Sequence, residues 1–322
     1  YDNIPEITAV GETPLALAPE SHVDLNIVAN MLVARDYQEV ITYSFIDEKS
    51  DAVFLAAPSK LKLSNPISSE MSVMRSSLLP GLLLAAAANR ARHQARVRFF
   101  EIGRTYHGTD ESPQEVQRIA GVIAGDVLGE QWGAPAQPVD FYDIKADVTA
   151  IVSLSGDGDS VRYDAIENNV LQPGQAAEII RGNESIGMIG KLHPSIAKQF
   201  DIDTNVFVFD LDAEKTFTAS VPNAKAISRF PIIRRDIAVV VNDSVAGAEL
   251  VAAAEAAAPD LVKSVRIFDV YRGKGIEAGL KSIALGLILQ ETSRTLTDDD
   301  ADTAMAAALG KLQQEFAAVL RD

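Results

Sequence analysis

Apolar positions near the start of the chain recur with the period of an amphipathic helix. Ile27 and Met31 lie four residues apart. Ser21, followed three residues later by Asp24, has the pattern of a capping box at a helix start. Together these patterns predict a helix over about 22–35.

A second helical segment follows Ser76 and Ser77, either of which can cap its first turn. Pro80 is compatible with that turn, because the first amide groups of a helix have no partner within it. Residues 82–88 are apolar on every side, which favours burial against other helices or against a partner chain.

Short runs rich in β-branched and aromatic residues predict strands in the larger part of the chain. Many are separated by turns rather than by crossover helices, which favours an antiparallel or mixed sheet. The predicted strands cover 40–45, 97–102, 119–123, 186–189 and 206–211.

The remainder of the chain predicts a different order of elements. Thr297, with Asp300 three residues later, marks the start of its second helix. These elements follow one another in the ferredoxin-like βαββαβ order, so we expect an α+β protein. The predicted elements are a strand over 232–241, a helix over 245–257, strands over 262–271 and 280–289, a helix over 298–313 and a short end strand.

Polar residues and Pro222 interrupt the apolar pattern between these two parts. We therefore expect a core module over 1–212, a linker over 213–224 and a second domain over 225–322. The formal net charge is -16, yet residues 225–322 hold 12 basic and 14 acidic residues. A locally basic surface is therefore possible in the second domain.

Missing residue types exclude several kinds of chemistry. Without cysteine the chain forms no disulfide, thiolate zinc site or iron–sulfur cluster, which fits a reducing, cytoplasmic location. Its four histidines are scattered, so we expect no metal site.

The longest apolar stretch, 78–88, is shorter than the roughly 20 residues of a membrane-spanning helix. The chain begins at Tyr1 without a leader, and we expect it to be a piece of a longer protein.

Four further patterns have simple structural explanations. The glycines between Gly187 and Lys191 are too close together for a phosphate loop. Asp140 and Asp143 could be a catalytic carboxylate pair, but Asp143 is better placed to cap a helix that begins near residue 144. His193 could be a general base at a turn, but a lone histidine is more often a structural group. Five arginines could bind phosphate but are more typical of a solvated or interface surface: Arg90, Arg92, Arg96, Arg98 and Arg104.

Residues 267–275 end a strand with an aromatic ring, a carboxylate and two cations beside a flexible loop. Single-stranded RNA recognition uses this combination, because a ring stacks on a base while cations meet phosphates. In the next strand, Ser282, Ala284 and Gly286 form a row of small residues with room for a flat ligand. The sequence does not show whether Tyr271 and Ser282 share a face, and an ordinary hairpin with a core-edge tyrosine explains the pattern equally well.

Several longer motifs occur in a fixed order. They are Tyr-Asp-Asn-Ile-Pro at 1–5, Asn-Pro-Ile-Ser at 65–68, Met-Arg-Ser-Ser-Leu-Leu-Pro-Gly-Leu at 74–82, Phe-Phe-Glu-Ile-Gly-Arg at 99–104, Asp-Phe-Tyr-Asp-Ile-Lys at 140–145, Gly-Lys-Leu-His-Pro at 190–194, Arg-Phe-Pro-Ile-Ile-Arg-Arg-Asp at 229–236, Phe-Asp-Val-Tyr-Arg-Gly at 268–273 and Arg-Thr-Leu-Thr-Asp at 294–298. Along the whole chain they resemble the C-terminal part of the beta subunits of bacterial phenylalanyl-tRNA synthetases.

The resemblance implies a class II synthetase-like core module, followed by a ferredoxin-fold anticodon-binding domain. In this family the core module is a degenerate catalytic domain, and the arginines that hold ATP in class II sites are absent from 98–110 and after 206–211. We therefore expect no catalytic residue, metal or cofactor here, with ATP and magnesium used by the holoenzyme. The implied partner is the catalytic alpha subunit, in a dimer of alpha–beta pairs, with helices near 22–35 and 78–92 at the interface.

The same resemblance places contacts to the anticodon of tRNA(Phe) at Asp269, Tyr271 and Ser282. Tyr271 is expected to stack on the first anticodon base, with Asp269 and Ser282 bonding to base edges. Six cations are implied as supporting contacts to the RNA backbone, of which only some will reach phosphate: Arg229, Arg234, Arg235, Arg272, Lys274 and Lys281. Two alternatives stay open: a small-molecule regulatory module of ferredoxin-like fold without RNA binding, and an enzyme with its own ATP site.

Overall fold

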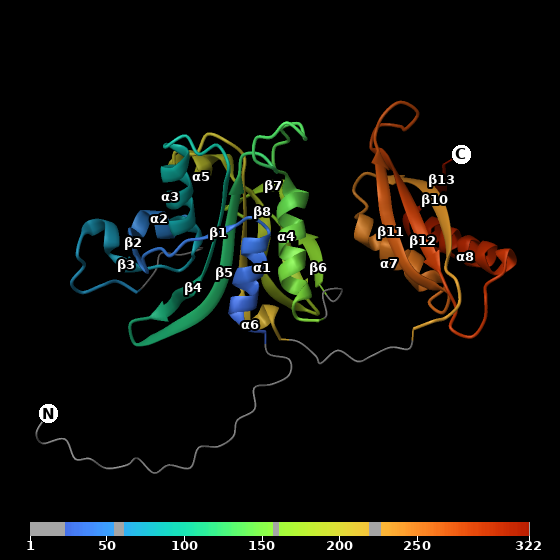
Figure 1. Cartoon of the computed structure of the whole chain (residues 1–322), viewed down its shortest axis with the longest axis horizontal. Coiled ribbons are helices and arrows are strands. Elements are labelled where there is room, and N and C mark those ends of the chain that lie inside the picture. The colour runs from blue at the N-terminus through green and yellow to red at the C-terminus, as the bar shows by residue number, and fades with distance from the viewer. Residues whose placement is uncertain (1–22, 55–60, 157–160, 219–226, 322) are drawn as a thin grey trace, which may run out of the picture. The chain divides into compact units, whose positions relative to one another are not determined.

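The computed structural model describes residues 23–54, 61–156, 161–218 and 227–321. The chain divides into two compact units, Tyr1–Pro222 and Asn223–Asp322 (Figure 1). The motif at 1–5, Ser21 and the second half of the expected linker, 219–224, lie outside the described residues.

The first unit combines a large sheet with helices on both faces (Figure 1). Its helices are α1 (Leu25–Ala34), α2 (Glu48–Ala52), the 3-10 turn η1 (Ser69–Met71), α3 (Leu79–Arg90), α4 (Phe141–Ser153), α5 (Pro194–Gln199) and α6 (Ala213–Thr216). Its strands are β1 (Gln38–Glu39), β2 (Phe45–Ile46), β3 (Val73–Met74), β4 (Val97–Thr109), β5 (Ser112–Ala124), β6 (Val161–Ala165), β7 (Leu171–Arg181), β8 (Glu184–Leu192) and β9 (Val206–Asp212).

Seven of the described strands form the main sheet, in the order β1-β4-β5-β9-β8-β7-β6. β1 pairs with β4 in parallel, and the other neighbours are antiparallel. The prediction of a mixed sheet is therefore confirmed. The pattern missed β6 and β7, which are less uniformly apolar than the strands that it found.

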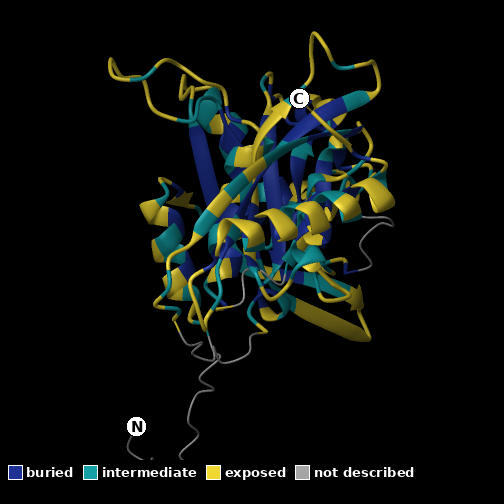
Figure 2. Ribbon diagram, turned by 90° about the vertical axis from the view of Figure 1, so that its right-hand side faces the viewer, coloured by how far each residue is buried: buried dark blue, intermediate teal, exposed yellow. Residues whose placement is uncertain are grey.

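Each face of this sheet buries its own apolar core. Leu79, Leu82 and Leu83 of α3 pack on one face, together with residues of α5. Residues of α1 and α4, among them Leu32 and Val148, pack on the other face. Figure 2 colours the buried segments of the chain dark blue and the exposed ones yellow, and the yellow lies on outer helix turns and loops. The sheet is thus a rigid central layer that fixes the helices on both sides.

Two predicted elements of this unit are wrong in their bounds. α1 begins at Leu25 rather than near residue 22, because the Asp24 carboxylate accepts from the Asn26 amide at 2.9 Å and caps the helix there. The strand predicted over 40–45 does not form as one element. The Thr42 amide and hydroxyl instead donate to the Glu101 carboxylate, at 3.3 and 2.7 Å, which takes the backbone out of the ladder.

Two predicted helix caps differ in detail from the observed ones. Leu78 occupies the N-cap position of α3, although the Ser77 hydroxyl accepts from the Leu79 amide at 3.1 Å. At α4 the N-cap is Asp140, and the Asp143 carboxylate accepts from the Asp140 amide at 2.7 Å, which completes a capping box. Both carboxylates are therefore structural. The first four residues of the expected linker form α6.

The second unit has the predicted ferredoxin-like order, with Thr297 and Asp300 forming the capping box of its last helix. Its elements are β10 (Ile233–Asn242), α7 (Gly247–Ala257), β11 (Val262–Tyr271), β12 (Leu280–Leu289), α8 (Asp298–Phe316) and β13 (Val319–Leu320). The strands form an antiparallel sheet in the order β11-β12-β10-β13. α7 and α8 share one core with Leu285 and Leu287 of β12, so both helices cover the same face.

Candidate nucleic-acid interface

The face of the second sheet that turns away from α7 and α8, here called the open face, has a floor of small residues. Because side chains alternate along a strand, Leu285 and Leu287 enter the core while Ala284 and Gly286 face the other way. Ser282 belongs to the same row. The central strand therefore lies low between its neighbours, and a flat ligand has room above it.

Strand register brings the three predicted anticodon contacts onto this face. Tyr271 pairs with Ser282, and Asp269 pairs with Ala284, two residues further along each strand. Directly opposite residues of antiparallel strands point to the same side of a sheet. Tyr271 and Ser282 thus share a face, which the sequence alone left open.

The Tyr271 ring stands half-buried at one end of this row and is held by two contacts. Its hydroxyl donates to the Lys274 carbonyl at 3.2 Å. Gly273 makes this approach possible, because a Cβ there would lie 2.8 Å from the Tyr271 hydroxyl oxygen. The guanidinium carbon of Arg321 lies 4.8 Å from the ring centroid. The ring is therefore fixed in direction before any ligand arrives.

Arg321 is the contact that the sequence analysis missed. It follows β13, which pairs with β10, and its Nη1 donates to the Ser282 hydroxyl at 3.3 Å. It thus links two of the three predicted residues. A two-residue strand near position 320 gives no periodic signal, so nothing in the sequence pattern points to this contact.

Asp269 and Ser282 offer different groups to a ligand. Asp269 is exposed, and its carboxylate has no recorded partner in the described part of the chain, so its oxygens are free to accept from a base edge. Ser282 is 3% exposed, with its hydroxyl on the floor beside Arg321. A base over this floor can exchange hydrogen bonds with both.

Four of the six cations implied as RNA contacts are exposed. Arg272 pairs with Asp243 at 2.8 Å and Arg234 with Asp236 at 2.9 Å, and exposed pairs of this kind are easily exchanged for another anion. The other two, Arg229 and Lys274, have no ion pair recorded among the described residues.

The remaining two cations are not on the open face. Arg235 alternates with Arg234 and pairs with Asp298 of α8 at 2.5 Å, on the helix side of the sheet. Lys281 is 8% exposed, its Nζ donates to the Asp243 carbonyl at 2.8 Å, and burial lowers the pKa of its ammonium group. Both side chains therefore have structural roles within the second unit.

In the first unit, three arginines that lie on or against the main sheet are already paired. Arg75 binds Glu101 at 2.7 Å, with both side chains buried. Arg118 binds Asp210 at 2.8 Å. Arg98 is buried and binds Asp147 at 2.5 Å, so its assignment to a solvated or interface surface was wrong. These guanidinium groups are engaged by carboxylates of the chain itself.

The other patterns noted in the sequence are structural. Gly187 lies within β8, where a Cβ would come within 2.2 Å of the Asp210 carbonyl oxygen, so close strand packing requires glycine. His193 caps α5, its Nδ1 accepting from the Ser195 amide at 3.3 Å. No group of three or more potential metal ligands occurs in the part of the chain that the structure describes. Among the same residues, no helix is long and apolar enough to cross a membrane.

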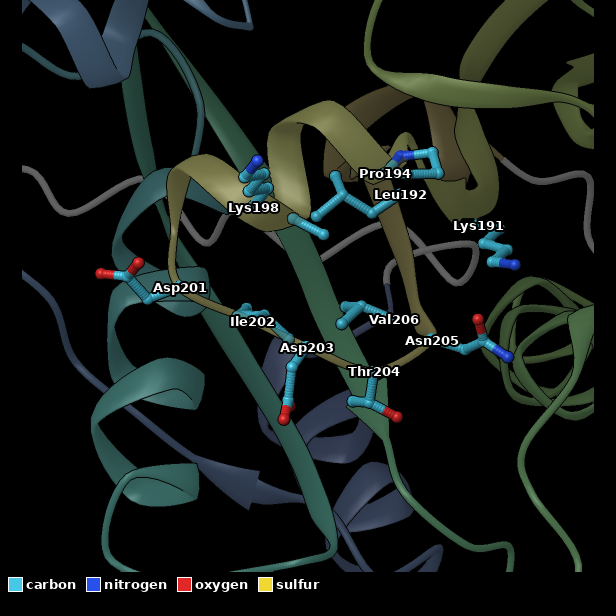
Figure 3. A pocket seen from close by; sticks show the side chains of 11 residues that line it. Lys191, Leu192, Pro194, Lys198, Asp201, Ile202, Asp203, Thr204, Asn205 and Val206 are labelled. Atoms are coloured by element: carbon cyan, nitrogen blue, oxygen red, sulfur yellow. The ribbon is translucent and has the colours of Figure 1, made fainter.

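An open hollow of about 710 Å³ lies beside α5 and the segment that leads into β9. Figure 3 shows Lys191 and Lys198 well apart at its rim, with Asp201 and Asp203 along the same loop. Because cations and carboxylates do not converge on one point, this hollow is not assigned a ligand.

Two family models match the chain: the phenylalanyl tRNA synthetase beta chain CLM domain over residues 4–213, and the ferredoxin-fold anticodon binding domain over residues 228–321. Curated phenylalanine–tRNA ligase beta subunits of Methylococcus capsulatus and Yersinia pestis are each 41% identical to it over the whole chain, which spans 41% of their length. A solved structure, the pyrrolysyl-tRNA synthetase from Desulfitobacterium hafniense, matches 60% of this chain and 66% of its own, at 12% identity and a TM-score of 0.43.

Proposed function

Because the chain belongs to the phenylalanyl-tRNA synthetase beta-chain family, we propose that its second unit binds the anticodon of tRNA(Phe) and that its first unit supports a catalytic partner. The observation that carries the first half is the row on the open face, where Asp269, Tyr271 and Ser282 lie side by side by strand register.

This row has the groups that an unpaired base needs. The Tyr271 ring offers a stacking surface, the Asp269 carboxylate accepts from an amino or imino group, and the Ser282 hydroxyl can donate or accept. Positive charge for the phosphates comes from the exposed cations Arg229, Arg234, Arg272 and Lys274. A regulatory site for a small molecule needs no such spread of cations, so the arrangement favours RNA.

Replacing the Tyr271 ring tests this proposal. Tyr271→Ala removes the stacking surface and should weaken binding of the anticodon stem-loop by about 1 to 3 kcal/mol. Tyr271→Phe keeps the ring and is the matched control, with affinity near that of the unchanged chain. Fluorescence anisotropy with labelled RNA measures both. Equal affinities of all three proteins for the stem-loop would refute the assignment.

The first unit is proposed as a noncatalytic scaffold. Arg75, Arg98 and Arg118 are each bound to a carboxylate of the chain, so none is available for a triphosphate. ATP and magnesium are then bound by the holoenzyme at the catalytic alpha subunit. Millimolar ATP with magnesium should leave the melting temperature of this chain unchanged, since a ligand stabilises a protein only by binding its folded state.

The proposed partner of the first unit is that alpha subunit, in a dimer of alpha–beta pairs in the cytoplasm. The support is that helices on both faces of the sheet leave apolar side chains exposed: Leu84 on α3 is half exposed, as are Ile27 and Val33 on α1. Exposed apolar groups on helices that are otherwise well packed are typical of protein interfaces. Mass measurement of the co-expressed complex tests the stoichiometry.

A further inference from the structure

A second aromatic ring lies on the open face, displaced along β11 from Tyr271. Phe268 is 54% exposed, although aromatic side chains usually contribute to a core. The pairing of β11 with β12 shifts by one residue between Ile267 and Asp269, which leaves Phe268 without a partner in register. Alternation counted back from Tyr271 would place Phe268 on the helix side, and the bulge changes this parity, as it also does for Arg266 opposite Gly286.

Arg234 shows which way the redirected ring points. Its guanidinium carbon lies 5.4 Å from the Phe268 ring centroid. A Cβ added at Gly286 would come within 3.2 Å of Arg234 Nη2 and 3.1 Å of Asp236 Oδ1. Arg234 and Asp236 therefore lie above Gly286 on the open face, and Phe268 meets Arg234 there.

We propose that Phe268 and Arg234 form a second stacking site, which takes another unpaired base of the same RNA strand. This inference rests on the proposed anticodon binding at Tyr271. An exposed ring beside a planar guanidinium is a surface on which bases stack, and the missing side chain at Gly286 lets the Arg234 guanidinium lie close against the sheet. Asp236 beside them can accept from the edge of that base.

The spacing and the charge of this surface both suit one RNA strand. Phe268 and Tyr271 are three residues apart on a strand that rises about 3.3 Å per residue, so the rings are separated by roughly 10 Å or less. That distance is too long for two bases in continuous stacking, and it suits bases that are splayed apart. Arg266, opposite Gly286, adds a further exposed cation to this end of the open face. Four-stranded sheets of related topology stack two or three bases on exposed rings, which is an analogy of fold only.

The test compares Phe268→Leu, which keeps apolar bulk but removes the ring, with Phe268→Trp, which keeps a stacking surface. Anisotropy measures their affinity for the anticodon stem-loop and for stem-loops that lack one loop base at a time. We expect Phe268→Leu to weaken binding about tenfold and Phe268→Trp to bind like the unchanged chain. The loss should vanish for RNA lacking one particular base, and this base should differ from the one that removes the Tyr271→Ala effect.

Each other result overturns the inference in a recognisable way. Unchanged affinity of Phe268→Leu, together with weaker binding by Tyr271→Ala, refutes the second site and leaves the first. Unchanged affinity in both variants refutes the proposed function as well. If both effects depend on the same base, the two rings serve one site. Circular dichroism confirms folding, and Arg234→Gln, which should also weaken binding, gives an independent measurement if Phe268→Leu is unstable.

Discussion

The Arg321 guanidinium lies over the Tyr271 ring, 4.8 Å from its centroid, and also donates to the Ser282 hydroxyl. One cation therefore contacts two residues of the proposed anticodon-binding row, from a segment at the opposite edge of the sheet. A cation over an aromatic face contributes about 0.5 to 1 kcal/mol where it is exposed. The contact orders the ring before RNA binds.

Arg321→Ala should weaken binding of the anticodon stem-loop by about 1 kcal/mol, because the ring loses its fixed direction and the open face loses one positive charge. Titrations at several salt concentrations separate these effects. If Arg321 also contacts a phosphate, the slope of log affinity against log salt falls by about 1. Arg321→Lys keeps the charge and is the control for that slope. An affinity equal to that of the unchanged chain would show that Arg321 has no part in binding.

Asp147 is a buried carboxylate of the first unit that accepts three side-chain hydrogen bonds. Its two oxygens accept from Arg35 at 2.7 Å, from Arg98 at 2.5 Å and from the Tyr37 hydroxyl at 2.7 Å. Asp147→Ala leaves the buried Arg98 cation unpaired and should cost about 3 to 5 kcal/mol in the free energy of unfolding. Urea denaturation measures this loss.

The exposed pair between Arg104 and Glu115, at 2.7 Å, provides the matched control. Glu115→Ala should change the free energy of unfolding by less than about 1 kcal/mol, because water screens exposed pairs. Equal losses for Asp147→Ala and Glu115→Ala would contradict the importance given to burial.

His107 makes the stability of the first unit depend on pH. Burial lowers the pKa of its imidazole below 6.5, and Arg118 adds to this, while Asp210 and Asp51 oppose it. The unfolded chain therefore takes up this proton at a higher pH than the folded chain. The stability that neutral His107 contributes to the folded state is fully present above pH 6.5. It is lost as the pH falls through the pKa of His107 in the folded state.

We expect the free energy of unfolding to drop more between about pH 7.5 and 5.5 in the unchanged chain than in His107→Gln. Burial also raises the pKa of Asp210 and of Asp51. Their effect on stability has the opposite sign to that of His107, because the stability gained from a protonated buried carboxyl is lost as the pH rises. Both proteins contain these two carboxyls, so the difference between the two pH profiles reports His107 together with its electrostatic coupling to Asp210 and Asp51. Parallel profiles would contradict the lowered pKa.

The sequence predicted the second unit better than the first, for a physical reason. β12 alternates strictly between core and open face, and the predicted bounds of β11 and β12 agree with the structure. The segment around Thr42 has the composition of a strand, yet its amide binds the Glu101 carboxylate, a contact 59 residues away that no local pattern reports. Local periodicity thus predicts strands that pair regularly with other strands, and it fails where a distant side chain binds the backbone.

The residue types of the candidate RNA-binding site could be predicted from the sequence, but their arrangement could not. The Tyr271 segment has the right residue types, and the small row of β12 is visible in the sequence, but their common face depends on register. Lys281 looked like an available cation and is buried against the Asp243 carbonyl. Phe268 reaches the open face only through a bulge. Bulges and long-range pairing are set by tertiary packing, and the alternation of residue types does not report them.

The exposed side of α3 is where we expect the catalytic partner to bind. Leu84 is 50% exposed and lines a hollow of about 1120 Å³ together with the exposed Ile41 and Tyr43. An arginine in place of Leu84 puts a charge into an apolar contact, so Leu84→Arg should reduce co-purification of a co-expressed alpha subunit at least about tenfold. Folding should be unaffected, because the side chain already faces outward.

Leu128→Arg is the matched control: Leu128 is 51% exposed but does not line this hollow, and its variant should retain the partner. Full recovery of the alpha subunit with Leu84→Arg would move the interface away from α3.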